Sequence, residues 1–582
     1  MSTICQRRRS LDHLSISATP GEREELVESA DIEGHGADSS WPREATDDES
    51  ARLRHVADTV PKVVWLVAFT GAAQRLAFYG TTVPWQNYLQ NPPGHPLSPG
   101  ELGLGQSTAT IINNAFLFLS YLSPLPFAIV SDSWLGRYKT LLLSLAIFIA
   151  GVIVLFITSL PFAVVNKGTA LGGFIVALVL IGLGQGGTSA VVFPFLCDQI
   201  PEKPLQVIRT HKGEEVVIDP KLTIQHVFTV FYWMINIASL ITLATTTLEK
   251  NVSFWAAYLL PLCGLAASVV PFLLLNGRLT KLAPQGNVLP HAARVVVLAA
   301  RSGFHLSAAD PSQQMGNQSF PWTSVFVQEI RRGLRACRVV ICFVIFYLCF
   351  NQTTNNIISQ ASQMEISGVS NDTIQSMNPI FYIVLNPLIQ NILFPFLSRR
   401  RISFGPIARM SASFLFMALG TAYAAGIQKL IYSRGPCFTQ PSACEAAVIA
   451  TYDDAKQYRP NEISAWIQIP LHFLFAIGEI FGFVALNEFA YTEAPTNMKA
   501  LVKAFEQFTA ALGAALGVAL GPVSKDPWMV IVYSVIAGVT AVTGIAVYAT
   551  FRAYDASWYT KEVIENIGDQ PSTRNLSEAK QE

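Results

Sequence analysis

The amino-acid sequence predicts an all-α integral membrane protein whose helices form two bundles. Hydrophobic residues make up 51% of the 582-residue chain and charged residues only 14%, against about 25% charged residues in a typical soluble domain. Apolar segments of about 20 residues, the length that a helix needs to cross a bilayer, recur along the chain. A long polar stretch divides them into two sets. The formal net charge of zero gives no sign of nucleic-acid binding.

Twelve apolar segments have the composition of membrane-spanning helices. Proline and glycine occur inside several of them, which a helical bundle tolerates because neighbouring helices satisfy the freed backbone groups. In chain order the segments lie near 63–89, 105–128, 138–161, 170–197, 223–247, 254–275, 338–360, 376–397, 404–430, 463–487, 498–522 and 527–550.

The segments divide the chain into five regions. Residues 1–60 are polar and rich in Ser, Glu, Asp and Arg, which is typical of a disordered tail. Within the linker, 289–302 has the pattern of an amphipathic helix able to lie on the membrane surface. The expected regions are a cytoplasmic tail (1–60), a six-helix bundle (61–275), a cytoplasmic linker (276–337), a second six-helix bundle (338–551) and a cytoplasmic tail (552–582).

Basic residues orient the predicted helices. The linker is rich in Lys and Arg. The eighth segment is followed by Arg399, Arg400 and Arg401, and the second is followed by Arg137 and Lys139. The positive-inside rule therefore places these loops and both termini in the cytoplasm. Six helices, a long cytoplasmic linker and six more helices are the layout of the twelve-helix major facilitator fold, in which two bundles rock about a midplane site. We expect a multi-pass protein of the plasma membrane.

The first segment carries an arginine within an apolar run, GAAQRLAFYG. A cation at membrane depth is costly and is usually functional. Arg75 could instead extend its guanidinium to the membrane surface. Its position in mid-helix, one turn before Tyr79, favours a cavity.

The tenth segment carries Glu479 among aromatic and aliphatic residues, about half a membrane from either end. An ionisable group at that depth is a functional candidate, suited to carrying a proton or binding a substrate amine. Glu488 and Glu493 lie in LNEFAYTEAPTNMK, nearer the cytoplasmic end. We expect these two residues to support gating.

Two further segments contain polar side chains. FYWMINIASL (Phe231–Leu240) holds Asn236, whose amide needs polar partners in a bundle; substrate and an interhelical hydrogen bond remain equal alternatives. The seventh segment reads FNQTTNNIISQASQM from Phe350. Polar groups at this density, beginning with Asn351, indicate a polar cavity or an external gate.

The loop SDSWLGRYKT (Ser131–Thr140) follows the second segment. It places Asp132 where a carboxylate can cap or pair helix ends, with Arg137 at the level of the headgroups. A plain basic loop is the simpler alternative. Together with FYWMINIASL and LNEFAYTEAPTNMK, this loop resembles the proton-dependent oligopeptide transporter (POT/PTR) family in its fungal-like form, and the resemblance covers about 61–551.

The resemblance implies a secondary active transporter of di- and tripeptides or peptide-like small molecules, linked to protons. It assigns gating to Asp132 and Arg137 and proton coupling to Glu479. The substrate-binding residues that it implies are Arg75, Tyr79, Tyr121, Asn236, Asn351, Asn378 and Glu479.

The chain departs from the family pattern at its charged positions. The family motif in the first helix is Glu-X-X-Glu-Arg-X-X-Tyr-Tyr-Gly; Gly71 and Gln74 occupy its carboxylate positions, and Phe78 replaces the first Tyr. In the fourth helix Ser189 stands where the family has Lys. A glutamine does not titrate, so this part of the proton relay is missing. A buried ammonium group without its carboxylates would be costly, so the joint loss of the acids and the lysine is electrostatically consistent. The alternative is that these residues were lost together as the function was lost.

Two other functions fit the same layout. One is an exporter or uncoupled carrier of a peptide-derived metabolite, and the other is a ligand receptor that transports nothing. No nucleophile–base pair, metal cluster or cofactor motif stands out, so we expect neither an enzyme nor a metal site. The family resemblance implies protons as the coupling ion and no other cofactor. The expected partners are the lipid bilayer and a peptide-like substrate, without nucleic acid, and the expected state is a monomer.

Two modifications are predicted in external loops. Cys437 and Cys444 share the loop GPCFTQPSAC, where a disulfide would persist outside the cell; a bridge and two free thiols are equal alternatives. Asn371 heads the sequon Asn371-Asp372-Thr373, which would make the protein a glycoprotein.

Overall fold

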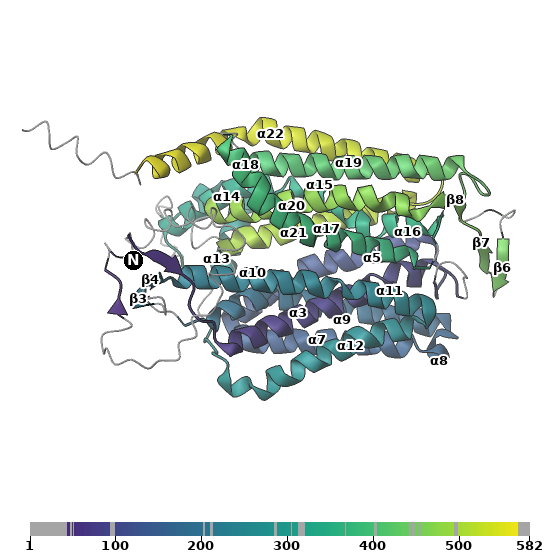
Figure 1. Ribbon diagram of the computed structural model, residues 1–582, viewed down its shortest axis with the longest axis horizontal. Coiled ribbons are helices and arrows are strands. Elements are labelled where there is room, and N and C mark those ends of the chain that lie inside the picture. The colour runs from purple at the N-terminus through teal and green to yellow at the C-terminus, as the bar shows by residue number, and fades with distance from the viewer. Residues whose placement is uncertain are drawn as a thin grey trace, which may run out of the picture.

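Helices in two bundles run along the length of the molecule (Figure 1). The N-terminal bundle is coloured purple to teal, and the C-terminal bundle, green to yellow, lies above it in this view. The computed structural model describes residues 43–46, 49, 52–93, 99–201, 204–209, 214–284, 288–303, 305–311, 321–366, 368–400, 404–441, 444, 448–452, 455–493 and 499–568.

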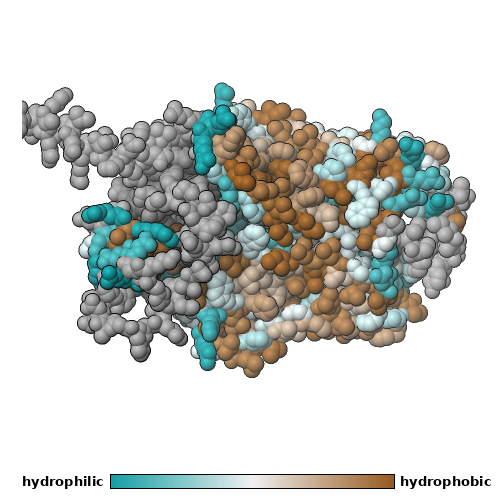
Figure 2. Space-filling model, viewed as in Figure 1, coloured by the Kyte–Doolittle hydropathy of each residue, from teal (hydrophilic) through white to brown (hydrophobic). Residues whose placement is uncertain are grey.

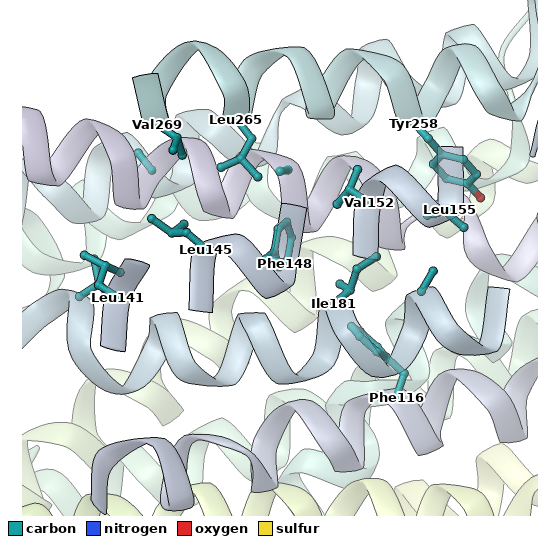
Figure 3. Packing of buried hydrophobic residues seen from close by; sticks show 14 of the residues in the cluster. Phe116, Leu141, Leu145, Phe148, Val152, Leu155, Ile181, Tyr258, Leu265 and Val269 are labelled. Carbon is teal, nitrogen blue, oxygen red and sulfur yellow. The ribbon is translucent and has the colours of Figure 1, made fainter. Parts of the chain in front are cut away.

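The N-terminal bundle has a continuous core of buried aromatic and aliphatic side chains, part of which lies between α7 and α9 (Figure 3). Gly184 allows α7 and α9 to approach closely, because a Cβ at this position would lie 2.6 Å from the Cβ of Phe148. The helices are α3 (Lys62–Thr82), α4 (Trp85–Gln90), α5 (Gln106–Leu122), α6 (Pro124–Val130), η2 (Ser131–Leu135), α7 (Gly136–Thr158), α8 (Pro161–Val164), α9 (Lys167–Asp198), α10 (Pro220–Ser239), α11 (Ile241–Asn251) and α12 (Phe254–Leu274).

The C-terminal bundle has a second core, and its predicted seventh segment is broken where the polar run begins. There α15 ends at Phe350, and α16 begins at Asn356 after a single 3₁₀ turn. The helices are α14 (Ser324–Val340), α15 (Phe343–Phe350), η5 (Asn351–Thr354), α16 (Asn356–Ser362), η6 (Asn371–Ser376), α17 (Met377–Leu388), η7 (Ile389–Leu393), α18 (Phe394–Arg399), α19 (Pro406–Ser433), η9 (Ala465–Gln468), α20 (Ile469–Glu493), α21 (Lys499–Leu520), η11 (Gly521–Val523) and α22 (Met529–Gly568).

The surface carries an apolar band across the middle of the molecule, with hydrophilic residues toward both ends (Figure 2). Within the described residues, nine helical runs are long and apolar enough to cross a membrane, or ten if the bent pair Ser324–Val340 and Phe343–Ser362 is one span. One run, Gln106–Thr158, covers two predicted segments because α5, α6, η2 and α7 are continuous. The membrane class is confirmed, and the count of twelve stays a prediction.

A small sheet corrects the prediction that 1–60 is a disordered tail throughout. Strands β1 (Arg43–Glu44) and β2 (Arg54–Val56) pair with the hairpin of β3 (Gln206–Arg209) and β4 (Glu215–Ile218), in the order β1-β3-β4-β2. His55 Nδ1 lies 3.2 Å from Asp219 Oδ2 beside the sheet. These strands find their partners more than 160 residues away in sequence, which local composition does not reveal. Residues 1–42 lie outside the described residues.

The linker contains the predicted amphipathic helix as α13 (Val288–Arg301), followed by η4 (Leu306–Ala309). Its apolar face is covered by protein rather than lipid: Ala292 and Val295 pack with Val327 and Ile330 of α14. The predicted position on the membrane surface is therefore wrong for this face. Helix α22 also continues to Gly568, so the region beyond 551 begins as helix rather than as a tail.

The two ends of the molecule differ in structure (Figure 1). We call the end that carries β1 to β4 the terminal end. The opposite end, which we call the far end, carries β5 (Met364–Glu365) paired with β8 (Asn461–Ser464), and β6 (Val448–Tyr452) paired with β7 (Ala455–Tyr458).

Candidate functional site

Arg75 of α3 belongs to an uncharged hydrogen-bonded network with α9. Its Nη2 donates to Ser189 Oγ at 3.2 Å, and Gln185 Nε2 donates to the same oxygen at 3.3 Å. Gln74 Nε2 in turn donates to Gln185 Oε1. The network therefore connects Gln74 and Ser189, the two positions at which the family resemblance places a carboxylate and an ammonium group. Amides and a hydroxyl join the helices here.

Gly71, at the other lost carboxylate position, leaves no room for a side chain. A Cβ built there would lie 2.8 Å from Val192 Cγ2 and 2.9 Å from Phe231 Cζ. Contacts this short force neighbouring side chains or backbone to shift. The missing acid has therefore been replaced by close packing of α3 against α9 and α10.

Glu479 and Asn378, both predicted from the sequence, meet in the C-terminal bundle. Glu479 of α20 is only 8% exposed, and its Oε1 accepts a hydrogen bond from Asn378 Nδ2 of α17. Asn378 is neutral, so this hydrogen bond orients the carboxyl group without balancing a negative charge. The arrangement leaves Glu479 suited to a cation or a proton.

Tyr121 of α5 lies within electrostatic range of both charged groups. Its side chain interacts electrostatically with Arg75 and Tyr79 of the N-terminal bundle and with Glu479 of the C-terminal bundle. Its ring also contacts Tyr347 of α15, with the centroids 5.7 Å apart. Four predicted residues are thus brought into one region between the bundles.

Two tyrosines that the sequence analysis missed join the same region. Tyr232 of α10 and Tyr382 of α17 both interact electrostatically with Tyr79 and Glu479. Their hydroxyls lie 3.5 Å apart across the bundle interface. Tyr232 belongs to the motif FYWMINIASL, which carries the family resemblance. Its place in that motif was the signal by which the sequence could have indicated Tyr232.

Asn236 lies beside Tyr232 and Tyr382 of this cluster, whereas the Asn351 side chain forms no hydrogen bond with it among the described residues. Asn236 Nδ2 donates to the Tyr232 carbonyl of its own helix at 2.8 Å, and the residue lines a small pocket between α10 and α17. Asn351, at the break after α15, is 1% exposed, and its Nδ2 has no hydrogen-bond acceptor among the described residues. Their predicted contact with substrate stays a prediction.

The predicted gating loop forms an ion pair, with a partner that the sequence analysis did not name. Arg137 Nη1 binds Asp198 Oδ1 at the end of α9. Asp132 interacts electrostatically with Arg137 but is not its hydrogen-bonded partner in this structure. Glu488 and Glu493 lie on α20, and their side chains are outside the described part of the chain.

Hydrogen bonds between the two bundles gather at the far end. Asn87 of α4 and Asn371 of η6 exchange two of them, each 2.8 Å long. The others at this end join Ser107 to Gly521, Thr110 to Asn356, Thr242 to Ser376, Thr246 to Thr373, Glu249 to Ser370 and Lys250 to Val369. The far end is therefore closed by polar contacts.

This network corrects the prediction of a glycan on Asn371. The side chain is 1% exposed, and its Nδ2 donates to Asn87 Oδ1 and to the Ile358 carbonyl. Both amide hydrogens are used, so a glycan at this nitrogen is incompatible with the closed structure. The sequon marked an external loop, and the fold uses that loop as an interface.

Cys437 and Cys444 are free thiols in the structure, and they are neighbours. Burial, together with the nearby Cys444 thiol, raises the pKa of the Cys437 thiol to about 12. A disulfide between them stays a prediction. In the described part of the chain, no group of three or more His, Cys, Asp or Glu residues is placed to hold a metal ion.

Two helical bundles with an apolar band, and with Arg75 and the buried Glu479 where they meet, are typical of a secondary transporter of the major facilitator class. The chain belongs to the POT family, whose model matches residues 138–536. It is a transporter and not an enzyme.

Relatives of known name cover most of the chain. Peptide transporter PTR_A of Candidozyma auris is 38% identical over 94% of this chain and 90% of its own length. The probable peptide transporter ptr2 of Schizosaccharomyces pombe is 38% identical over 88% and 81%. Among solved structures, the POT family transporter PepTSo matches with a TM-score of 0.67 and 20% identity, over 86% of this chain and 99% of its own, which supports the fold.

Proposed function

We propose that this protein imports di- and tripeptides across the plasma membrane, coupled to protons. The observation that carries the proposal is the placement of Arg75 and Glu479, from different bundles, around the same Tyr121. A short peptide has a carboxylate at one end and an ammonium group at the other. A guanidinium group binds a carboxylate through two parallel hydrogen bonds, and the buried Glu479 carboxylate complements the ammonium group.

The position of these groups also fits alternating access. Arg75 belongs to the N-terminal bundle and Glu479 to the C-terminal bundle, so a peptide bound to both would link the bundles while they rock. The basic loops favour a cytoplasmic terminal end and cytoplasmic termini. The closed far end would then face outward, and the structure would correspond to an inward-facing state of a monomer in the bilayer.

Glu479 is the proposed carrier of the coupled proton. The uncharged network around Gln74 and Ser189 offers no titratable group there, whereas Glu479 is buried and has a neutral partner. Protons are the only coupling ion in this scheme, without a further cofactor.

The experiment is uptake of a labelled dipeptide into liposomes that contain the purified protein, with and without an inward proton gradient. We expect accumulation above equilibrium only with the gradient. Equilibration that ignores the gradient would overturn the coupling. Absence of uptake together with efflux from preloaded vesicles would show an exporter, and binding without flux would show a receptor.

Blocked peptides test the two ends of the site separately. Arg75→Ala should raise KM for a free dipeptide and leave KM unchanged for its C-terminal amide, which lacks the carboxylate. Glu479→Gln should abolish the pH dependence of transport. Ser534→Ala is the control, because Ser534 is exposed and bonds only within its own helix. Equal effects of Arg75→Ala on both peptides would indicate a structural role.

A further inference from the structure

The closed far end contains a carboxyl group that the transport site does not use. Glu249 of α11 is 3% exposed, and its Oε1 accepts hydrogen bonds from Asn87 Nδ2 and Ser370 Oγ, both at 3.0 Å. Its second oxygen, Oε2, is buried without a hydrogen-bond donor among the described residues. Ser370 belongs to the other bundle, so Glu249 lies in the interface itself.

A second carboxyl group faces Glu249 from the C-terminal bundle. Asp372 of η6 is 0% exposed, and its carboxyl group interacts electrostatically with Glu249. Both of its side-chain oxygens are buried without a hydrogen-bond donor among the described residues. Two carboxylates only accept hydrogen bonds. A hydrogen bond between them therefore requires a proton on one of them, and two like charges buried together do not both ionise. One shared proton would supply the donor that Glu249 Oε2 and the Asp372 oxygens lack among the described residues.

Two other titratable groups, Lys250 and Tyr258, face this pair, and Tyr258 connects it to two more. Lys250 Nζ donates to the Val369 carbonyl across the interface and interacts electrostatically with Asp372. Tyr258 of α12 interacts with both carboxyl groups, with Tyr88 of α4 and with Glu101 of the loop before α5. Burial raises the pKa of Glu101 to about 7.

The charges of the pair balance when it holds one proton. One remaining carboxylate is then matched by the Lys250 ammonium group nearby. Without the proton, a second negative charge would be buried without a counter-ion of its own, which is costly at low dielectric.

We propose that Glu249 and Asp372 form a proton-binding site that locks the far-end gate: one shared proton joins the bundles, and its loss separates them. The proposal deepens the proposed function, because it gives the transporter a proton-sensing group in place of the missing first-helix acids. It commits to the hydrogen ion as ligand.

The two acids lie on different bundles, so opening the gate must break the bond and expose both to water, where both ionise near neutral pH. Opening therefore releases a proton, and acid must favour closure by the same coupling. For one proton, the ratio of closed to open gates should change by up to about tenfold per pH unit.

The test measures the gate without substrate. Nitroxide labels go on Val252→Cys and Glu365→Cys, exposed far-end positions on the two bundles, with Cys263, the exposed cysteine among those described, replaced by Ser. Electron–electron distance measurements in nanodiscs between pH 5 and 8 report the gate. We expect a short distance at pH 5 and a growing population at longer distance as the pH rises. A distribution that does not change with pH overturns the proposal.

Matched variants assign the response to the pair. Glu249→Gln places a permanent amide donor opposite Asp372, so the gate should stay closed at every pH; Asp372→Asn should do the same from the other side. Thr246→Val removes a neutral hydrogen bond of the same interface, so it should favour opening equally at all pH values. A pH response that survives in both amide variants but vanishes in Glu101→Gln would transfer the site to Glu101 and overturn the proposal.

These measurements separate the inference from the proposed function. If dipeptide uptake fails while the labelled pair still responds to pH through Glu249, the substrate assignment is wrong and the lock stands. If proton-driven uptake succeeds while the gate ignores pH, the lock is wrong and coupling belongs to Glu479.

Discussion

Arg75 Nη2 donates a 3.2 Å hydrogen bond to Ser189 Oγ, joining α3 to α9 through a neutral acceptor. Gln185 shares that acceptor and links it to Gln74. The guanidinium group is therefore held in place by groups that carry no opposite charge. Under the proposed function, the carboxylate of the peptide would supply the counter-charge of Arg75.

Returning a lysine to position 189 should destabilise the protein. Ser189→Lys places an ammonium group beside Arg75 without a carboxylate, and an uncompensated buried charge costs about 3–5 kcal/mol. We expect a lower Tm in detergent, measured by tryptophan fluorescence. Ser189→Met has similar bulk without charge and should lose less. Adding Gln74→Glu to Ser189→Lys should recover part of the loss, and a double variant no more stable than Ser189→Lys would contradict this account.

Gly184 should tolerate no methyl group. Gly184→Ala would bring a Cβ to 2.6 Å from Phe148, and overpacking of this kind costs about 1–3 kcal/mol. Gly538→Ala in α22 is the matched control, because a Cβ there meets nothing within 4 Å. Thermal unfolding of the two variants should show a lower Tm for the first and an unchanged or slightly higher Tm for the second. Equal Tm values would show that α7 and α9 can move apart freely.

The far-end loop should make stability depend on pH through Glu101. Burial raises its pKa from 4.5 to about 7, so the folded protein keeps this proton to higher pH than the unfolded chain. The stabilisation is complete below pH 4.5 and is lost as the pH rises to 7. Glu101→Gln should therefore show a smaller decline of Tm between pH 4.5 and 7.5 than the parent. An unchanged decline would assign the effect to other acids.

The ion pair of Arg137 with Asp198 should behave as one unit. The Asp198 side chain is 6% exposed, and its Oδ2 is buried without a partner in the described structure. Removing only the cation leaves a buried charge unpaired, so Arg137→Met should lower Tm more than the double variant with Asp198→Asn. Initial uptake rates of the same proteins test the gating role. Additive effects on Tm and uptake would mean that the pair does not couple.

The sequence was sufficient to find candidate site residues where a charged or polar side chain interrupts an apolar segment. Arg75 and Glu479 stand out because each places charge inside an apolar run, and the structure brings both near Tyr121. The polar run from Asn351 was also visible in the sequence, but the break in the seventh segment at that point was not predicted. Such signals depend on the cost of polar groups in lipid, which is readable one segment at a time.

Pairings between distant segments were not readable. Gln74 and Gln185 are ordinary amides until α3 and α9 pack together. Glu249 follows an apolar segment like any polar helix end, and Asp372 was noticed only as the centre of a sequon. Their meeting depends on how the two bundles close, which no local pattern encodes. The strands at 43–56 were not predicted for the same reason, because their partners lie far away in the sequence.

The crowding around Gly71 bears on how this chain could change over time. An acid at this position collides with Val192 and Phe231, so a single mutation restoring the family motif would be rejected by the fold before its chemistry could be selected. The side chains of Val192 and Phe231 would have to change or shift first. The departure from the family motif is therefore hard to reverse by a single substitution. We expect any gain of proton sensitivity to arise elsewhere in the protein.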